Sequence, residues 1–566
     1  MRVLKAGLKR DDYSWRQIRP GLWQRDADEA EVCYSTLVKL YEGSGRMLFA
    51  ITGHISLSIQ VPEDEDREVV SKRLDESLRI AWLRQRYETP TIASYVHYDA
   101  LDGKWKKSYR TIPDDVSTKS WLEKTFQVIS TAFGHTGEDW ANCDPPAPNT
   151  ATLFVVCPAI PLQDPSTIRR DLVLRSPHDI IDGIGTLQFL NSLVTKTAQA
   201  FSEGEFFREL PVFDGSEASN LSPPYRVAAN IPLVPTPEQQ ARLDAIKAAA
   251  SEPSSNPDDQ TLAPLDIGIP FAKGPLLPGK HQRVAHYISS ERTSALTTSL
   301  KKHHPGTTVT HAFHAAIALA LRNTHMKPPS SKSSSSVPSS TASHRPAAGP
   351  GQKVRYTNYL LHNERGSCQP PYDTPKHCVS VYHSLSASKL QVDMSPTLPE
   401  TREERREEFE TVLEQIKGFY TAVRDDPLHY ALAPATWAEH TPLLPEGVLK
   451  GEEKMEVPKP KKVPSVSISS MGVVDRIVKR EHSLGLGGEG RGKLEVHRPW
   501  VTGEELTNGL GVFLGKFDGV LCLSCAYNEA WHIKGDVDDF LWDVERLVGS
   551  WVEGGNDFFN LQQKGR

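Results

Sequence analysis

A histidine and an aspartate, His178 and Asp182, are the side chains best suited to chemistry in this 566-residue sequence. They lie in the segment PHDIIDG, which spans positions 177–183. An imidazole whose pKa lies near neutrality can accept a proton and return it, as a general base must. Histidines in loops are more often solvated or hydrogen-bonded structurally, and Asp182 could serve only as a helix cap. On these residues alone, both interpretations stay open.

The segment connects a predicted buried strand to a predicted amphipathic helix. The apolar run Leu172–Leu174 has the length and composition of a buried strand. After the segment, apolar residues recur every three or four positions, as on one face of a helix: Ile184, Leu187, Leu190, Val194, Ala198 and Phe201. Asp182 suits the N-cap of this helix, and Gly183 would allow a close backbone approach. Such a connection can present the imidazole of His178 rigidly to a cavity.

His-x-x-x-Asp-Gly between a strand and a helix resembles the hallmark of a known superfamily. This is the condensation-domain, chloramphenicol-acetyltransferase-like superfamily of acyl-CoA-dependent acyltransferases, whose motif is His-His-x-x-x-Asp-Gly. Within it, the sequence is most similar to the fungal O-acetyltransferases of secondary metabolism, including the trichothecene acetyltransferases. The segment Tyr527–His532 also resembles these enzymes, and the likeness covers roughly Trp15 to Glu553. Pro177 stands where the first motif histidine usually is.

The resemblance implies a mixed α/β fold of two chloramphenicol-acetyltransferase-like lobes with an active-site tunnel between them. Acyl-CoA, most simply acetyl-CoA, would enter as co-substrate from one mouth and a hydroxylated acceptor from the other. The expected acceptor is a fungal secondary metabolite such as a trichothecene-like sesquiterpenoid mycotoxin. His178 matches the catalytic histidine of the motif. Asp182 would pair with an arginine that shapes the loop, and Arg86 is the matching position.

Histidine chemistry suits acyl transfer from a thioester to an alcohol. An imidazole can take the proton of the alcohol during attack and return it to the leaving thiolate, without a covalent enzyme intermediate. The tetrahedral oxyanion needs a hydrogen-bond donor. Ser469 and Ser470, at the end of a predicted strand, are candidates by position only.

The composition of the chain divides it into three regions. We expect a first lobe at 1–203, a proline-rich crossover at 204–282 and a second lobe at 283–566. Residues 327–351 are rich in Ser and Pro and carry too few apolar groups to offset ordering entropy, so a disordered insertion is predicted there.

Further elements follow from periodicity and turn residues. We predict strands at 33–41, 150–160 and 377–384 and helices at 121–133 and 236–250. A hairpin is expected around Asp518-Gly519, and a last helix should be capped by Asp536.

Size, charge and cysteine content exclude several classes of protein. Hydrophobic residues make up 38% and charged residues 24% of the chain, as in globular proteins. A net charge of −6 gives no reason to expect nucleic acid or an anionic membrane as a partner. No segment approaches a membrane span, and seven cysteines do not make a disulfide framework. We expect a cytoplasmic monomer with reduced thiols and no tightly bound cofactor.

Other motifs support no competing site. Histidines and cysteines occur in two groups that lack the spacing of zinc ligands, so no metal site is predicted. They are His311 and His314, and His362, Cys368, His377 and Cys378. The glycine-rich stretch 485–492 is interpreted as a surface loop, and no Gly-x-Ser-x-Gly elbow occurs.

Two alternatives to an acyl-CoA-dependent O-acyltransferase remain open. One is a catalytically inactive binding or scaffold member of the same fold, in which Pro177 would mark decay of the site. The other is a carrier-protein-dependent condensation enzyme that forms an amide or an ester.

Overall fold

The computed structural model describes residues 10–131, 135–158, 166–203, 210–251, 262–326, 348–349, 351–485 and 492–552. The predicted insertion at 327–351 and the glycine-rich loop at 485–492 lie almost entirely outside these ranges. Within them, no helix is long and apolar enough to cross a membrane.

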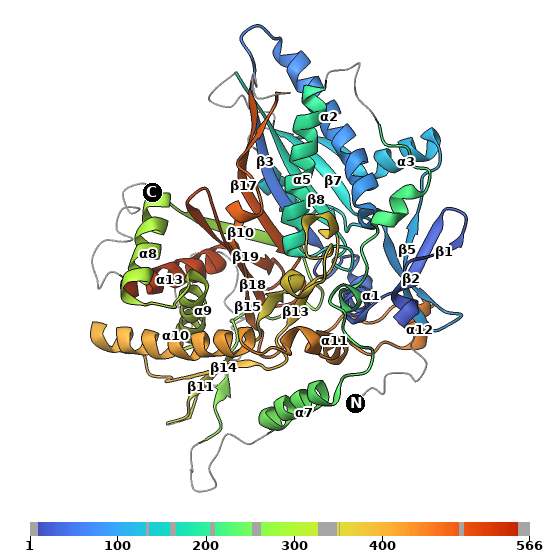
Figure 1. Cartoon of the computed structure of the whole chain (residues 1–566). Helices are drawn as coiled ribbons and strands as arrows, with labels where there is room; N and C mark the ends of the chain where they lie inside the picture. Colours follow the sequence, from blue (N-terminus) through green and yellow to red (C-terminus); the bar gives the residue numbers. More distant parts are fainter. Residues whose placement is uncertain are drawn as a thin grey trace.

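The largest sheet has six strands in the order β16-β17-β3-β8-β7-β6. In chain order these are β3 (Ile51–Gln60), β6 (Phe126–Thr131), β7 (Thr152–Pro158), β8 (Thr167–Ser176), β16 (Glu481–Ser483) and β17 (Lys493–Gly503). Helices α2 (Arg67–Glu88) and α5 (Gly183–Ser202) pack against each other over it (Figure 1). Helices α3 (Asp115–Thr125) and α4 (Gly137–Ala141) also contact it.

β8 lies in the interior of this sheet, between β3 and β7. Leu172, Val173 and Leu174 are fully buried, because helices and loops cover both faces of the sheet there. In α5, Leu187 and Leu190 are fully buried, on the stripe predicted from the sequence. The predicted strand and helix on either side of His178 are therefore confirmed, and the strand is longer than its apolar run.

The second large sheet has four strands in the order β10-β19-β18-β15. These are β10 (His281–Ile288), β15 (Val466–Val473), β18 (Leu510–Phe517) and β19 (Val520–Asn528). Their core includes helices α8 (Ser290–His303), α9 (Val309–Met326), α10 (Arg402–Arg424) and α13 (Lys534–Val552). Asp518 and Gly519 have φ of 50° and 75°, as the tight turn of the predicted hairpin requires.

Smaller elements complete the fold. One four-stranded sheet has the order β1-β2-β5-β4, made of β1 (Arg16–Arg19), β2 (Leu22–Asp26), β4 (Tyr95–Asp99) and β5 (Lys104–Arg110). Two further sheets contain β9 (Leu265–Asp266), β11 (Val354–Asn358) and β14 (Leu390–Met394), and β12 (Leu361–Asn363) and β13 (His383–Leu385). The remaining helices are α1 (Glu29–Tyr41), α6 (Tyr225–Ala228), α7 (Pro237–Ser251), α11 (His429–His440) and α12 (Glu446–Lys450).

Several predicted elements differ from the structure. The predicted strand at 33–41 is part of α1, because Asp28 and Glu31 form a capping box that starts a helix ahead of it. The predicted helix at 121–133 ends at Thr125, and β6 begins at the next residue. Of the predicted strand at 377–384, only the end belongs to β13. Asp536 lies in the first turn of α13 and is not its cap.

The two halves of the sequence interlock in space. β17 pairs with β3 along its length, so the C-terminal half completes the sheet of the N-terminal half (Figure 1). In the other direction, α1 packs against α11, and Tyr34 joins an apolar cluster with Tyr382 and Trp437. The mixed α/β class is confirmed, whereas the domain boundaries at 203 and 282 stay a prediction.

Close packing under α5 leads to a stability prediction at Gly53 of β3. A Cβ atom at Gly53 would lie 2.2 Å from Thr186 Cγ2, so Gly53→Ala should destabilise the protein by about 1–3 kcal/mol. Adding Thr186→Ser removes that methyl group, keeps the hydroxyl that donates to the Asp182 carbonyl, and should restore most of the loss. Unfolding free energies measure both effects.

Gly418→Ala in α10 is the matched control. A Cβ atom there meets nothing within 4 Å, so this variant should gain stability from its helix propensity. Equal losses in Gly53→Ala with and without Thr186→Ser would contradict the proposed clash.

Candidate active site

The loop after β8 turns tightly into α5. The Ile180 N–H donates to the Pro177 carbonyl at 3.3 Å, and Pro177 is buried. Asp182 has extended backbone angles, and its Oδ1 accepts from the Gly185 N–H at 2.7 Å. Asp182 is therefore the N-cap of α5, as the sequence predicts.

The other carboxylate oxygen of Asp182 binds residues of the C-terminal half. Its Oδ2 accepts from Arg365 Nη1 at 2.9 Å and from the Tyr382 N–H at 2.8 Å. The Asp182 N–H also donates to the Ser380 carbonyl at 3.1 Å. The side chains of Asp182 and Arg365 are only 4% and 5% exposed, so this is a buried ion pair that joins the two halves of the chain.

The electrostatics keep Asp182 ionised. Burial alone would raise the pKa of its carboxyl, but the positive charge of Arg365 and an interaction with His383 hold that pKa well below its usual range. A permanently charged cap is thus maintained at the start of α5, where the helix dipole favours an anion.

The expected pairing of Asp182 with Arg86 is wrong. Arg86 lies near the end of α2 and donates through Nη2 to the Arg110 carbonyl at 2.8 Å. Its guanidinium lies 4.6 Å from the centre of the Trp121 ring. Arg86 is therefore a buried residue of the first half, and Arg365 holds the position beside Asp182.

The close approach expected at Gly183 occurs two residues later. A Cβ atom at Gly183 would make ordinary contacts, 3.5 Å from Val501 and 3.6 Å from Met471. At Gly185 it would lie 2.1 Å from the Cys378 carbonyl. The glycine that brings α5 against the C-terminal half is thus Gly185.

His178 lies in an aromatic enclosure built from both halves of the chain. The Tyr34 ring of α1 stacks on its imidazole with ring centroids 3.9 Å apart and an angle of 10° between the planes. The His383 ring lies 5.5 Å from that of His178, and Trp437 of α11 packs against both Tyr34 and His383. The stacked Tyr34 ring and the tilted His383 ring together fix the orientation of the imidazole.

Tyr34 and His383 form a hydrogen-bonded pair beside His178. The Tyr34 hydroxyl lies 2.8 Å from His383 Nε2, and burial raises its pKa well above the usual value. The hydroxyl therefore keeps its proton, and it donates to Nε2 in the tautomer whose proton is on Nδ1, which faces Asp182 Oδ2 at 3.8 Å.

His178 is held in its neutral form. Burial, followed by the neighbouring His383, lowers the pKa of the imidazole well below its ordinary value, and backbone groups and Asp182 only partly oppose this. At neutral pH the ring is uncharged and one nitrogen is free to accept a proton, but the lowered pKa makes it a weaker base than an imidazole in water.

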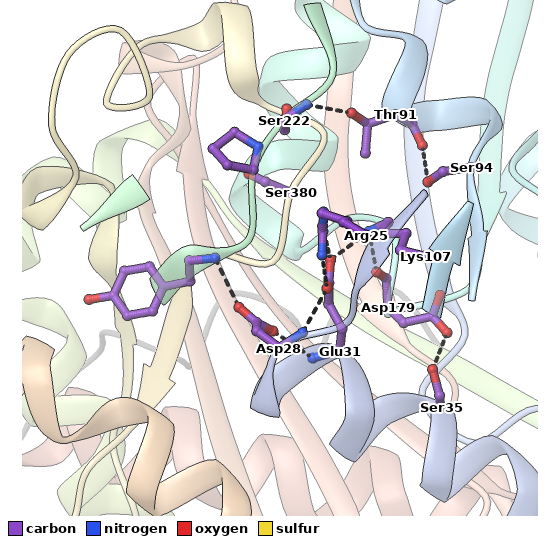
Figure 2. Close-up of polar contacts among 12 residues, drawn as sticks. Arg25, Asp28, Glu31, Ser35, Thr91, Ser94, Lys107, Asp179, Ser222 and Ser380 are labelled. Carbon is purple, nitrogen blue, oxygen red and sulfur yellow. Dashed lines mark hydrogen bonds and ion pairs between the residues drawn. The ribbon is translucent and has the colours of Figure 1, made fainter. Parts of the chain in front are cut away.

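The N-terminal half supports the same loop from the other side. The Lys107 ammonium donates to the Asp179 carbonyl at 2.7 Å, and the Ser35 hydroxyl donates to the Asp179 carboxylate at 2.7 Å (Figure 2). Glu31 accepts from Lys107 at 2.8 Å and from both terminal nitrogens of Arg25 at 2.7 Å (Figure 2). Lys107 is fully buried, so this network fixes the position of the loop.

The two serine candidates point in different directions. Ser470 lies on the same face of β15 as the core residues Val466 and Ile468, and its hydroxyl pairs with that of Thr310 at 2.9 Å. Ser469 lies on the opposite face. Of the two, Ser469 is the candidate that points away from the core of the second half.

A cavity of about 380 Å³ lies beside the first turn of α5. Met471 and Val501, the neighbours of Gly183, are among its lining residues, as is Leu187 of α5. The opposite wall comes from β10, β18 and β19, so the cavity separates the two large sheets. It is mostly apolar and large enough for part of an organic substrate.

Comparisons with known proteins agree with this architecture. No protein-family model matches the chain. The O-acetyltransferase pigM of Monascus ruber is 24% identical over 541 residues, covering 94% of this chain and 86% of that protein. The solved structure of the TRI3 trichothecene 15-O-acetyltransferase from Fusarium sporotrichioides has a TM-score of 0.72 at 17% identity, covering 96% of this chain and 98% of that one.

A more distant solved structure extends the likeness. The first condensation domain of the calcium-dependent antibiotic synthetase has a TM-score of 0.52 at 13% identity, covering 94% of this chain and 97% of that one. The chain therefore shares the fold of these two solved structures, and the resemblance predicted from the sequence is confirmed. Two relatives that match nearly the whole chain, pigM and TRI3, are O-acetyltransferases, so the predicted likeness to an O-acyltransferase enzyme is confirmed as well.

The buried pair yields a stability prediction. Asp182→Asn and Arg365→Gln should each cost about 3–5 kcal/mol, because each leaves a buried charge without its partner. The double variant should be more stable than the sum of the two losses implies, since no unpaired charge remains. A double-mutant cycle on the free energy of unfolding measures this coupling.

Arg86→Gln provides the control cycle. Arg86 is as deeply buried but binds elsewhere, so its effect should add to that of Asp182→Asn. Additive losses for Asp182 and Arg365 would show that the ion pair does not form in solution.

Proposed function

We propose that this chain is an acyl-CoA-dependent O-acyltransferase in which His178 is the general base. The observation that supports it best is the setting of His178: a neutral imidazole, stacked on Tyr34, on a loop that both halves of the chain hold in place. The likeness to two O-acetyltransferases supports the same reaction.

In this mechanism the acceptor hydroxyl gives its proton to His178 as its oxygen attacks the thioester carbon. The tetrahedral intermediate carries an oxyanion, for which Ser469 is the candidate donor. Collapse of the intermediate breaks the carbon–sulfur bond, and His178 returns the proton to the thiolate of CoA. Asp182 carries no proton in this scheme, because Arg365 keeps it ionised and its oxygens hold the loop.

We infer that the donor is acetyl-CoA and the acceptor a hydroxyl group of a secondary metabolite. The support is that the relatives are O-acetyltransferases and that TRI3 is named for a trichothecene. The mostly apolar lining of the cavity suits a hydrophobic acceptor or acyl chain.

Replacing His178 tests the proposal. His178→Ala should lower acyl transfer by about 100-fold or more, the contribution expected of a general base. Acetyl-CoA consumption is measured with a panel of hydroxylated secondary metabolites, alongside the melting temperature. His440→Gln, at the exposed end of α11, is the control and should behave as the unmodified protein does.

Each alternative has its own signature in that assay. Turnover that needs an acyl carrier protein and ignores free acetyl-CoA would indicate a condensation enzyme, to which the condensation-domain likeness also points. A protein that binds substrates without turning them over would be a scaffold member. Near-normal activity of a folded His178→Ala variant would remove His178 from the mechanism.

The two serines allow a matched comparison. Ser469→Ala should reduce kcat by about 100-fold if its hydroxyl stabilises the oxyanion, the loss typical of removing one such donor. Ser470→Ala changes the neighbouring residue on the opposite face and should leave kcat unaltered. Equal activities of both variants would exclude the Ser469 hydroxyl as an oxyanion donor.

A further inference from the structure

A second cluster of polar and titratable side chains lies on the face of β13 that points away from His178. Ser384 follows His383 in β13, and adjacent strand residues point to opposite faces. While His383 faces Tyr34, the Ser384 hydroxyl donates to Glu364 Oε1 at 2.5 Å. Glu364 begins the short 3₁₀ helix Glu364–Ser367, which also carries Arg365.

Two imidazoles converge on the Glu364 carboxylate. His362 Nδ1 and His429 Nε2 each lie 3.2 Å from Glu364 Oε1, and the donor atoms of the three residues all lie within 4.8 Å of one another. Ligands bound about 2.0–2.1 Å from a tetrahedral zinc ion lie about 3.3 Å apart. Only small side-chain adjustments would therefore place all three donor atoms around one ion.

The charge balance of this cluster favours a cation. The Glu364 side chain is 1% exposed, and among the described residues it forms ion pairs with the two histidines alone. A buried carboxylate needs compensation, which in most proteins comes from Arg, Lys or a metal ion. The His362 side chain is 39% exposed, so an ion could reach the cluster from solvent.

We propose that His362, Glu364 and His429 form a binding site for a divalent transition-metal ion of the zinc type. Two imidazoles and one carboxylate are a ligand set that zinc accepts, with a fourth position left for water. The site would tie β12, the segment with Arg365 and the start of α11 together behind the active-site loop. This proposal is independent of the acyl-transfer proposal. The expectation that no metal binds was based on ligand spacing in the sequence. It did not include His429, which lies far from His362 in the sequence and reaches Glu364 only in the folded protein.

Cobalt titration tests the proposal directly. Protein treated with a chelator should bind Co²⁺ with the visible absorption bands of a coordinated ion, and Zn²⁺ should displace it. His362→Gln and His429→Gln should each weaken Co²⁺ binding by about 100-fold or more, because losing even an outer partner of a ligand costs about 10–100-fold. His440→Gln, in the same helix as His429 but exposed at its end, should bind as the unmodified protein does.

Two results would overturn the proposal. One is the absence of such bands in the unmodified protein. The other is their persistence in His362→Gln, whose half-buried side chain can be replaced with less risk to the fold. Either would define the cluster as a hydrogen-bonded network of imidazoles and a carboxylate. Melting temperatures measured without metal show whether each variant is folded.

Discussion

The buried ion pair of Asp182 and Arg365 is the constraint on which the candidate active site depends. It joins the N-cap of α5 to a segment 183 residues further along the chain. Because Asp182 also binds the Tyr382 N–H, it places His383, and through it Tyr34, beside His178. The Asp182 carboxylate therefore caps α5, joins the two halves of the chain and positions the aromatic rings around the His178 imidazole.

The loop is held from two directions by charges of the same sign. Lys107 binds its backbone from the N-terminal half, and Arg365 binds its side chain from the C-terminal half. Both cations are buried. A loose arrangement would leave Arg365 without its carboxylate partner at a high free-energy cost, whereas Lys107 would keep its ion pair with Glu31 and lose one hydrogen bond. This arrangement explains how a loop can present a histidine in a fixed orientation while the ring itself stays neutral.

The parts of the site that sequence reasoning found are those with local signals. The strand before His178, the helix after it and the capping role of Asp182 follow from periodicity and residue type within about thirty positions. Arg365, Tyr34 and His383 were missed because they reach the site only through tertiary packing. Tyr34 was also assigned to the wrong element, because residues 33–41 have a strand-like composition. Only the capping box at Asp28 and Glu31 indicates that these residues form a helix. The sequence pattern of that capping box could have predicted the start of α1.

The pairing of β17 with β3 has a consequence for synthesis of the chain. β3 needs β17 as its neighbour, and paired residues such as His54 and Trp500 are separated by most of the sequence. While the ribosome is still making the C-terminal part, one edge of β3 has no partner, and unpaired strand edges promote aggregation. The N-terminal half made alone would keep that open edge permanently. The sheet should therefore be completed only after nearly the whole chain has emerged, so the open edge of β3 needs protection from aggregation until the end of translation.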